Sequence, residues 1–365
     1  MNAGTCRSLL PQTLLSVAAL VWLAGASMPA AVAQDRVIDQ PDKQALPVPD
    51  LLSLEVASTL DDSPQPSLYW APESASEKPT PLLVYLHSWS GDYRQKNSAW
   101  LGEAAKRCWI YLHPNFRGPN NTPAACGSKL ARQDILDAID RVVDRFKVDP
   151  SRIYLAGSSG GGHMSMLMAG HHPQRFSAVS AWVGISDLAE WYRFHTKDGV
   201  PQQYAKMIVA SCGGPPGASP EVDAEYRDRS PLFHLQNARD LPLDLNAGVN
   251  DGHTGSVPIF HTLRAYNVVA RAGQQQVISD YEMQTLWKQG KLTGPQPGDT
   301  TVDPSYGRKI LLRRTAGKAR VTIFDGGHEG LSHPGCAWLA TQRRATRKVG
   351  SKVNTTPVKT PVAAE

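Results

Sequence analysis

Long apolar runs are missing from this sequence, and so are the loops that bind common cofactors. The apolar run at residues 14–26 is shorter than the roughly 20 residues that a membrane-spanning helix needs. No glycine-rich segment has the spacing of a dinucleotide-binding or phosphate-binding loop. His328 and His333 are five residues apart, whereas the zinc-binding pattern H-E-x-x-H requires four. We therefore expect no cofactor, no metal and no stable membrane insertion.

The sequence also has little excess charge of either sign. It contains 38 Lys and Arg against 33 Asp and Glu, a formal net charge of +5. Much of this excess lies after residue 342, where no aromatic residues are interleaved with the basic ones. Nucleic-acid-binding segments combine basic and aromatic side chains. We therefore predict a disordered basic tail at residues 343–365 and no nucleic-acid partner.

The N-terminal residues have the pattern of an export signal. Arg7 is followed by the apolar run and then by a small-x-small cleavage site that ends at Ala33. This arrangement predicts a signal peptide at residues 1–33 and a secreted or periplasmic protein. Residues 34–50 are rich in Pro, Asp and Gln and are expected to form a linker.

Residues 51–342 are expected to form one α/β domain. Ile135, Ile139 and Val142 keep helical spacing, which predicts an amphipathic helix at 131–147. Strands alternating with helices indicate a mostly parallel sheet flanked by helices. Two insertions, near 190–235 and 275–308, break the rhythm and are either lids or packed surface excursions. The predicted strands lie at 52–56, 67–71, 82–86, 109–112, from 153 onward, and at 178–183, 241–245 and 321–324.

A serine motif lies between the strand that starts at residue 153 and the helix that follows it. Residues 157–161 read Gly-Ser-Ser-Gly-Gly and fit G-x-S-x-G. This pattern is typical of a nucleophile elbow, a sharp strand-to-helix turn that exposes a serine hydroxyl. Ser158 as the nucleophile would need Gly at position 156, and Ala156 stands there. We therefore predict that Ser159 is the nucleophile.

A serine hydroxyl is a poor nucleophile until a histidine takes its proton and a carboxylate holds that histidine. In proteins with a nucleophile elbow, the triad residues follow one another along the chain in the order Ser, then Asp or Glu, then His. Asp251 follows the strand at 241–245 in a glycine-rich loop, and His328 follows the last strand between glycines. These positions predict Asp251 as the acid and His328 as the base.

Four other residues compete for these roles. Asp244 lies inside its strand, and Asp325 is a loop carboxylate. His333 lies further along the chain, and His253 is close to Asp251 and is a candidate substrate contact. Asp325 has no assigned role, and Asp251 and His328 remain the predicted acid and base.

An oxyanion intermediate needs two preorganised N–H donors. Gly160, the residue after the nucleophile, supplies the first. The loop after the strand at 82–86 reads His87-Ser88-Trp89, with Ser88 where Gly is usual. By position, the backbone N–H of Trp89 is the second donor, and the Trp89 indole is expected to line the acyl pocket.

Together these segments resemble the α/β-hydrolase superfamily, and within it prolyl-oligopeptidase-like hydrolases and related secreted esterases. The resemblance rests on residues 148–162 and 172–177 and on the Asp251 and His328 loops. It implies the α/β-hydrolase fold and acyl transfer through a serine. Members include peptidases and esterases for phenolic, acetyl and polyester substrates.

Peptidases of the resembled group usually carry a β-propeller before the hydrolase domain, and residues 34–80 are too few for one. The resemblance therefore favours a carboxylic-ester hydrolase for a small-molecule or polymer-linked ester, such as an acylated polysaccharide or a phenolic ester. The alternatives are a compact serine peptidase and an inactive hydrolase that serves as a binding protein.

The cysteines add one expectation. The sequence has five, and Cys6 belongs to the predicted leader. Exported proteins usually pair their cysteines, and four allow three connectivities. Cys126 and Cys212 both fall in loops expected over the serine, so we predict a disulfide between them. Cys108, beside a predicted strand, is alternatively a small buried apolar residue.

Overall fold

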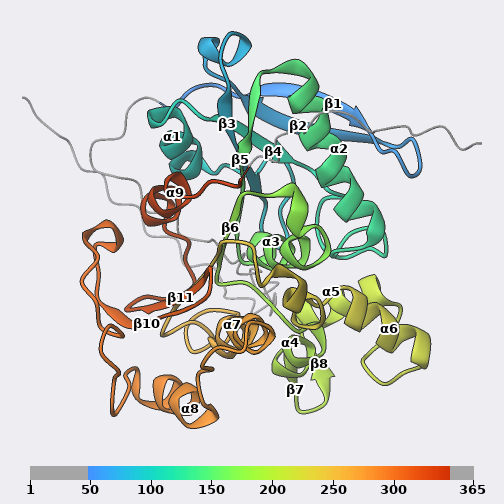
Figure 1. Ribbon diagram of the computed structural model, residues 1–365. Helices are drawn as coiled ribbons and strands as arrows, with labels where there is room; N and C mark the ends of the chain where they lie inside the picture. Colours follow the sequence, from blue (N-terminus) through green and yellow to red (C-terminus); the bar gives the residue numbers. More distant parts are fainter. Residues whose placement is uncertain (1–47, 346–365) are drawn as a thin grey trace, which may run out of the picture. The chain divides into compact units, whose positions relative to one another are not determined.

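The computed structural model describes residues 48–345 (Figure 1). The predicted signal peptide, nearly all of the predicted linker and most of the predicted basic tail lie outside these residues. Within residues 48–345, no helix combines the length and the apolar character that crossing a membrane requires.

The fold is built on one large sheet of nine strands in the order β1-β2-β4-β3-β5-β6-β9-β11-β10. A separate small hairpin is formed by β7 and β8. The strands are β1 (Leu52–Ala57), β2 (Pro64–Trp70), β3 (Thr80–Leu86), β4 (Ile110–Pro114), β5 (Val148–Ser158), β6 (Ala178–Trp182), β7 (Thr196–Lys197), β8 (Val200–Pro201), β9 (Leu243–Gly248), β10 (Ile310–Ala316) and β11 (Ala319–Phe324).

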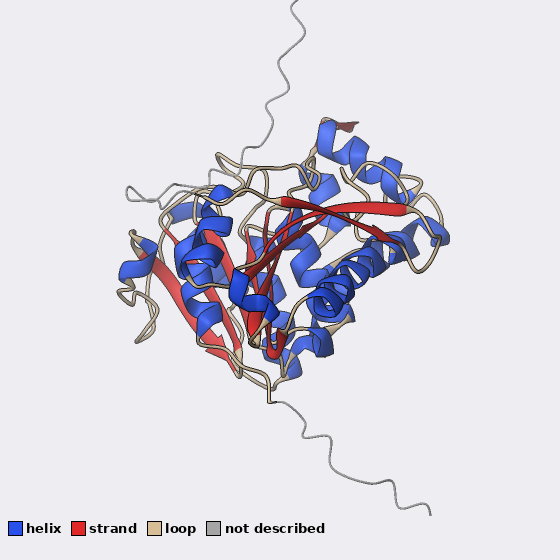
Figure 2. Ribbon diagram, turned by 90° about the horizontal axis from the view of Figure 1, so that it is seen from above, coloured by secondary structure: helices blue, strands red, loops and turns tan. Residues whose placement is uncertain are grey.

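The centre of this sheet is parallel. The pairs β4–β3, β3–β5, β5–β6, β6–β9 and β9–β11 are parallel, while β1, β2 and β10 join the edges as antiparallel strands. Every residue of β3, β6 and β9 is buried, as expected where helices cover both faces. Figure 2 shows these helices on the two sides of the twisted sheet. The carboxyl ends of the parallel strands meet at one edge, which positions the site described below.

The longer helices cover the sheet or belong to the insertions. Figure 1 shows α1 and α9 together on one side of the central strands and α2 on the other. The α-helices are α1 (Ser98–Lys106), α2 (Lys129–Arg145), α3 (Gly160–His171), α4 (Leu188–Phe194), α5 (Gln203–Cys212), α6 (Pro220–Asp228), α7 (Phe260–Ala272), α8 (Asp280–Gln289) and α9 (Ser332–Ala340). The 3₁₀ turns are η1 (Glu73–Ser76), η2 (Pro173–Arg175), η3 (Pro231–Phe233), η4 (Leu235–Ala238) and η5 (Pro304–Tyr306).

The structure confirms the predicted fold class and corrects two details. The segment at 275–308 is not wholly irregular, because it contains α8. Ser279 and Glu282 form a capping box at the start of α8, and Gly290 ends it with a left-handed backbone. The sequence prediction also missed β10, which pairs with β11 across a two-residue turn that begins with Gly317 at φ 59°. That glycine is the local signal for the hairpin.

Candidate active site

Ser159 occupies a strained turn between β5 and α3. Its backbone has φ 58° and ψ −119°, a conformation that costs a non-glycine residue on the order of 1–3 kcal/mol. The Ser159 N–H donates to the Trp182 carbonyl at 2.9 Å, which ties the turn to β6. A Cβ at Gly157 would lie 2.4 Å from the Gly161 carbonyl oxygen, so the turn closes only with glycine there. Such strain persists where the surrounding structure fixes it, which is a feature of functional sites.

Ser158, the neighbouring serine, has a different environment. Its hydroxyl lies 3.1 Å from the Tyr85 hydroxyl in a buried hydrogen bond. The chain after His328 packs against it, since a Cβ at Gly330 would lie 2.0 Å from Ser158 Oγ. The loop that carries His328 therefore sits directly on the elbow. The Ser158 hydroxyl is engaged inside the fold, whereas Ser159 is the residue at the turn.

Asp251 and His328 are joined although 77 residues separate them. His328 Nδ1 lies 2.8 Å from Asp251 Oδ2, and the Asp251 side chain is fully buried. The other carboxylate oxygen accepts the N–H groups of Gly252 at 2.9 Å and Val257 at 3.1 Å. Burial raises the pKa of Asp251, and the His328 ring opposes that rise. The carboxylate is thus fixed on both oxygens and orients one nitrogen of the imidazole.

The rival residues have other partners or none near the elbow. Asp244 accepts from Arg320 Nε at 2.8 Å and from the Ser180 hydroxyl at 2.9 Å within the sheet. Asp325 is exposed. His333 contacts Glu103 at 3.2 Å on α1. The structure therefore brings Asp251, and neither Asp244 nor Asp325, to His328.

Trp89 and Gly160 meet at the start of α3. A Cβ added to Gly160 would lie 2.2 Å from the Trp89 backbone nitrogen, so the two backbones are in close contact. The Ser88 N–H is already used, because it donates to the Gln95 side chain at 2.8 Å. Gln95 was missed by the sequence reasoning, and nothing in its local sequence marks it. The arrangement leaves Trp89 beside Gly160, the register that the sequence predicted for the second donor.

The comparisons with known proteins agree with this architecture. Residues 128–286 match the model of the prolyl oligopeptidase family. This segment contains β5, the elbow and Asp251. The chain carries a prolyl oligopeptidase family domain. Its fold is that of the α/β-hydrolases.

Individual relatives are distant. The chain is 24% identical to acylamino-acid-releasing enzyme 2 of Oryza sativa subsp. japonica over 55% of its own length and 28% of that enzyme. It is 24% identical to feruloyl esterase B of Talaromyces stipitatus over 65% of its own length and 62% of the esterase. The acylaminoacyl peptidase structure of Pyrococcus horikoshii superposes with a TM-score of 0.51 at 21% identity, covering 63% of this chain and 36% of that one. The last likeness concerns the fold.

The first insertion of the hydrolase packs as a helical cap. We define the cap as residues 188–228, which contain α4, α5 and α6. Trp191 of α4 contacts the Trp89 indole, with ring centroids 4.6 Å apart, and its Nε1 donates to the Ser256 carbonyl at 2.8 Å. Ser256 precedes Val257, whose N–H holds Asp251. The cap thus touches both the predicted oxyanion donor and the loop of the predicted acid.

The predicted disulfide is wrong. Cys126 and Cys212 are both free and buried. They lie in the apolar cluster between the cap and the hydrolase body, with Trp89 and Trp191. Burial raises the pKa of Cys126 to about 11 and also raises that of Cys212, which keeps both thiols protonated. In this cluster the cysteines act as small apolar side chains. Cys108 is exposed rather than buried.

His253 contacts the second insertion, at residues 275–308. The His253 ring stacks on Trp287 of α8 with a centroid distance of 3.7 Å. His253 Nε2 also lies 2.9 Å from the Trp287 carbonyl oxygen. His253 is exposed, so its predicted contact with substrate stays a prediction, and the structure adds an anchoring contact to α8.

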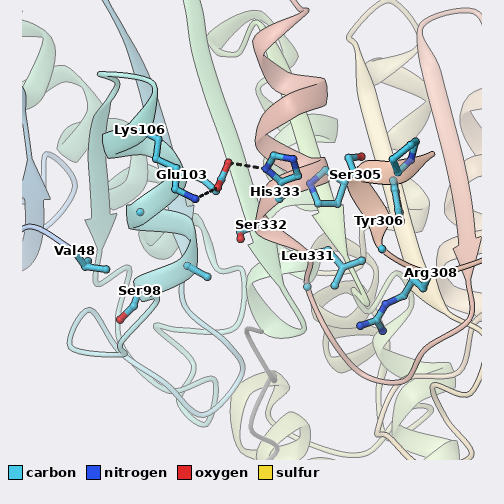
Figure 3. Close-up of a pocket in the computed structure, with 16 residues that line it drawn as sticks. Val48, Ser98, Glu103, Lys106, Ser305, Tyr306, Arg308, Leu331, Ser332 and His333 are labelled. Carbon is cyan, nitrogen blue, oxygen red and sulfur yellow. Dashed lines mark hydrogen bonds and ion pairs between the residues drawn. The ribbon is translucent and has the colours of Figure 1, made fainter. Parts of the chain in front are cut away.

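A pocket of about 480 Å³ lies between α1, η5 and α9 of the hydrolase. Figure 3 shows Glu103 and Lys106 on one side, Tyr306 and Arg308 on the other, and His333 between them. Glu103 forms an ion pair with Lys106 at 2.9 Å, and its second carboxylate oxygen lies 3.2 Å from His333 Nδ1. Gly330 also lines the pocket, so the pocket lies beside the loop that carries His328.

Proposed function

We propose that this hydrolase cleaves carboxylic esters through Ser159, His328 and Asp251. The observation that carries the proposal is the hydrogen bond between Asp251 and His328, on a loop that packs against the strained turn of Ser159. A carboxylate that orients a histidine beside a serine at such a turn is the arrangement that activates a hydroxyl.

The proposed reaction has two halves. Ser159 Oγ attacks the ester carbonyl carbon while its proton passes to His328 Nε2, and Asp251 stabilises the resulting imidazolium. The negative charge on the carbonyl oxygen is met by the N–H groups of Gly160 and Trp89. His328 then gives the proton to the departing alkoxide, which leaves as an alcohol. In the second half, water attacks the acyl carbonyl carbon while His328 takes one of the water protons. The bond to Ser159 Oγ then breaks, His328 returns this proton to Ser159 Oγ, and the carboxylic acid leaves.

Two considerations support an ester over a peptide substrate. The match to the feruloyl esterase covers 65% of this chain, and the match to the acylamino-acid-releasing enzyme covers 55%. An alkoxide also leaves more readily than an amine, which must be protonated as it departs. A phenolic or acetyl ester, small or polymer-linked, is the proposed substrate class.

The second candidate function is a compact serine peptidase. It is favoured by the match of residues 128–286 to a family named for an oligopeptidase. The same serine, histidine and aspartate would serve either reaction, so the leaving group discriminates between the two.

A matched pair of substrates tests the proposal. One acyl group, acetyl or feruloyl, is supplied as an aryl ester and as an anilide, and the ratio of uncatalysed rates is divided out. We expect kcat/KM for the ester to exceed that for the anilide by at least about 10³-fold, on the order of 4 kcal/mol in the barrier. Comparable turnover of anilides or of Ala- and Pro-linked peptides would restore the peptidase.

Labelling tests the nucleophile separately. A fluorophosphonate probe should modify Ser159, and Ser159→Ala should abolish both labelling and turnover. Ser158→Ala is the matched control. Ser158 is adjacent to Ser159 in the sequence, and the hydroxyl that this variant removes is hydrogen-bonded to Tyr85. Modification of Ser158 in the wild-type chain would refute the choice of serine. We also propose that the protein is exported by cleavage after Ala33, which N-terminal sequencing of the exported protein checks.

A further inference from the structure

Three potential metal ligands converge at a point away from the elbow. They are His171 at the end of α3, Asp228 at the end of α6, and His234 between η3 and η4. One ligand atom from each lies within 4.8 Å of the others. The two imidazole rings have centroids 4.0 Å apart. The family resemblance assigns no role to any of these side chains, and the proposed ester chemistry does not use them.

The packing of the chain builds this cluster. Gly170 allows the backbone of His234 to approach α3, because a Cβ at position 170 would lie 2.7 Å from His234 Cβ and 2.9 Å from its carbonyl carbon. Asn237 Nδ2 donates to the Gly170 carbonyl at 3.1 Å and fixes the same approach. These backbone contacts at Gly170 hold His234 close to His171, so the packing of the main chain brings the two rings together.

Neighbouring groups orient the three side chains. Arg132 Nη2 bonds Asp228 Oδ2 at 3.0 Å, and Asp228 Oδ1 lies 4.0 Å from His171 Nε2. Backbone carbonyls lie 3.3 Å from His171 Nε2 and 3.1 Å from His234 Nε2. Histidine ligands of metals commonly donate their second ring N–H to a carbonyl in this way.

We propose that His171, Asp228 and His234 bind a divalent transition metal, with zinc as the preferred ion. Two imidazoles and one carboxylate are typical zinc ligands, and water would complete a four-coordinate site. Calcium and magnesium prefer all-oxygen sites, which this cluster is not. Ligands about 2.0–2.2 Å from a tetrahedral ion lie roughly 3.4 Å from one another. The ligand atoms of this cluster all lie within 4.8 Å of one another, so binding requires each pair to approach by at most about 1.4 Å.

The metal would fasten the cap to the hydrolase body. Asp228 ends the last cap helix, and His171 ends the helix that begins beside Ser159. The ion would thus join α6 to α3 at the end remote from the serine. Its role is structural, and the proposed acyl transfer has no step that passes through it.

Zinc binding to the full-length chain tests the proposal. The protein is stripped with a chelator, dialysed and titrated with ZnCl₂ by calorimetry, and thermal unfolding is followed with and without zinc. We expect one zinc ion per chain and a higher Tm with zinc. His171→Ala and His234→Ala should each weaken binding by at least about 100-fold, because each removes one of three ligands. Cobalt should give the visible absorption bands of a four-coordinate site in the wild-type chain and not in these variants.

Two further variants make the result decisive. His172→Ala is the matched control, because His172 is the adjacent half-buried histidine and is not part of the cluster. It should bind zinc as the wild type does. Asp228→Asn keeps the side-chain shape and removes the carboxylate ligand. It replaces the histidine variants in the zinc titration if one of them fails to fold. Failure of the wild type to take up zinc from excess would overturn the proposal. Uptake that survives the loss of His171, Asp228 and His234 in turn would overturn it as well.

Discussion

Replacing Asp251 by Asn should separate catalysis from stability. The side chain is fully buried, and its two oxygens have different partners. Oδ1 accepts two backbone N–H groups, from Gly252 at 2.9 Å and Val257 at 3.1 Å, and Oδ2 faces His328 Nδ1 at 2.8 Å. An amide has one acceptor oxygen and one donor NH₂ group, so only one of these two sides can keep an acceptor.

The free-energy costs of the two amide orientations decide which one the variant adopts. If the NH₂ group faced the backbone, two N–H donors would lose their partner, at about 1–3 kcal/mol each. If the NH₂ group faces His328, one ring nitrogen changes from donor to acceptor, and the ring adopts the other tautomer. The second arrangement is less costly, so the amide oxygen should stay on Gly252 and Val257. The proton then sits on His328 Nε2, which can no longer accept the proton of Ser159.

We therefore expect kcat of Asp251→Asn to fall by about 10⁴-fold, the order seen when a triad histidine is held in the wrong tautomer. The Tm should change little. The assay is hydrolysis of a p-nitrophenyl ester, with calorimetry on the same samples. Asp244→Asn is the opposite control, because it breaks the pair with Arg320 and should lower Tm while kcat is retained. Activity of Asp251→Asn within about tenfold of wild type would refute the reasoning, as would an equal loss in Asp325→Asn.

Two more perturbations follow from the geometry. Gly160→Ala would place a Cβ 2.2 Å from the Trp89 nitrogen, so kcat should fall at least about 10²-fold, as when an oxyanion donor is lost. Gly102→Ala meets nothing within 4 Å in α1 and should leave kcat unchanged, so equal losses would contradict the assignment. Burial lowers the pKa of His163 to about 4 and that of His261 to about 3, so both gain a proton only on unfolding. Stability should therefore fall as pH drops from about 6.5 toward 4, by up to about 1.4 kcal/mol per pH unit for each ring, and a Tm that stays constant in this range would show that these rings are not buried as neutral groups.

Local patterns were sufficient for much of the molecule. The alternation of strands and helices predicted the parallel sheet, because each apolar run reflects burial of its own strand. The motif G-x-S-x-G selected Ser159, because Gly157 stands two residues before it, whereas Ala156 stands two residues before Ser158. A strained turn of this kind is encoded in adjacent residues. Chain order placed Asp251 and His328 after the correct strands, and the structure brings the two within 2.8 Å.

The tertiary structure decided what depends on segments that are far apart in the chain. The Gln95 side chain takes the Ser88 N–H and leaves Trp89 beside Gly160, a choice that a loop sequence does not encode. The thiols of Cys126 and Cys212 are free in an apolar cluster, although their loops suggested a disulfide.

The cap and the histidine cluster illustrate the same division. Trp191 reaches the Ser256 carbonyl 65 residues away, and His171 meets His234 because Gly170 lets a distant backbone approach. The sequence by itself determined the strands, the helices and the strained serine turn, because burial and backbone preference act on neighbouring residues. The tertiary structure determined which side chains face one another, because that depends on how distant segments pack.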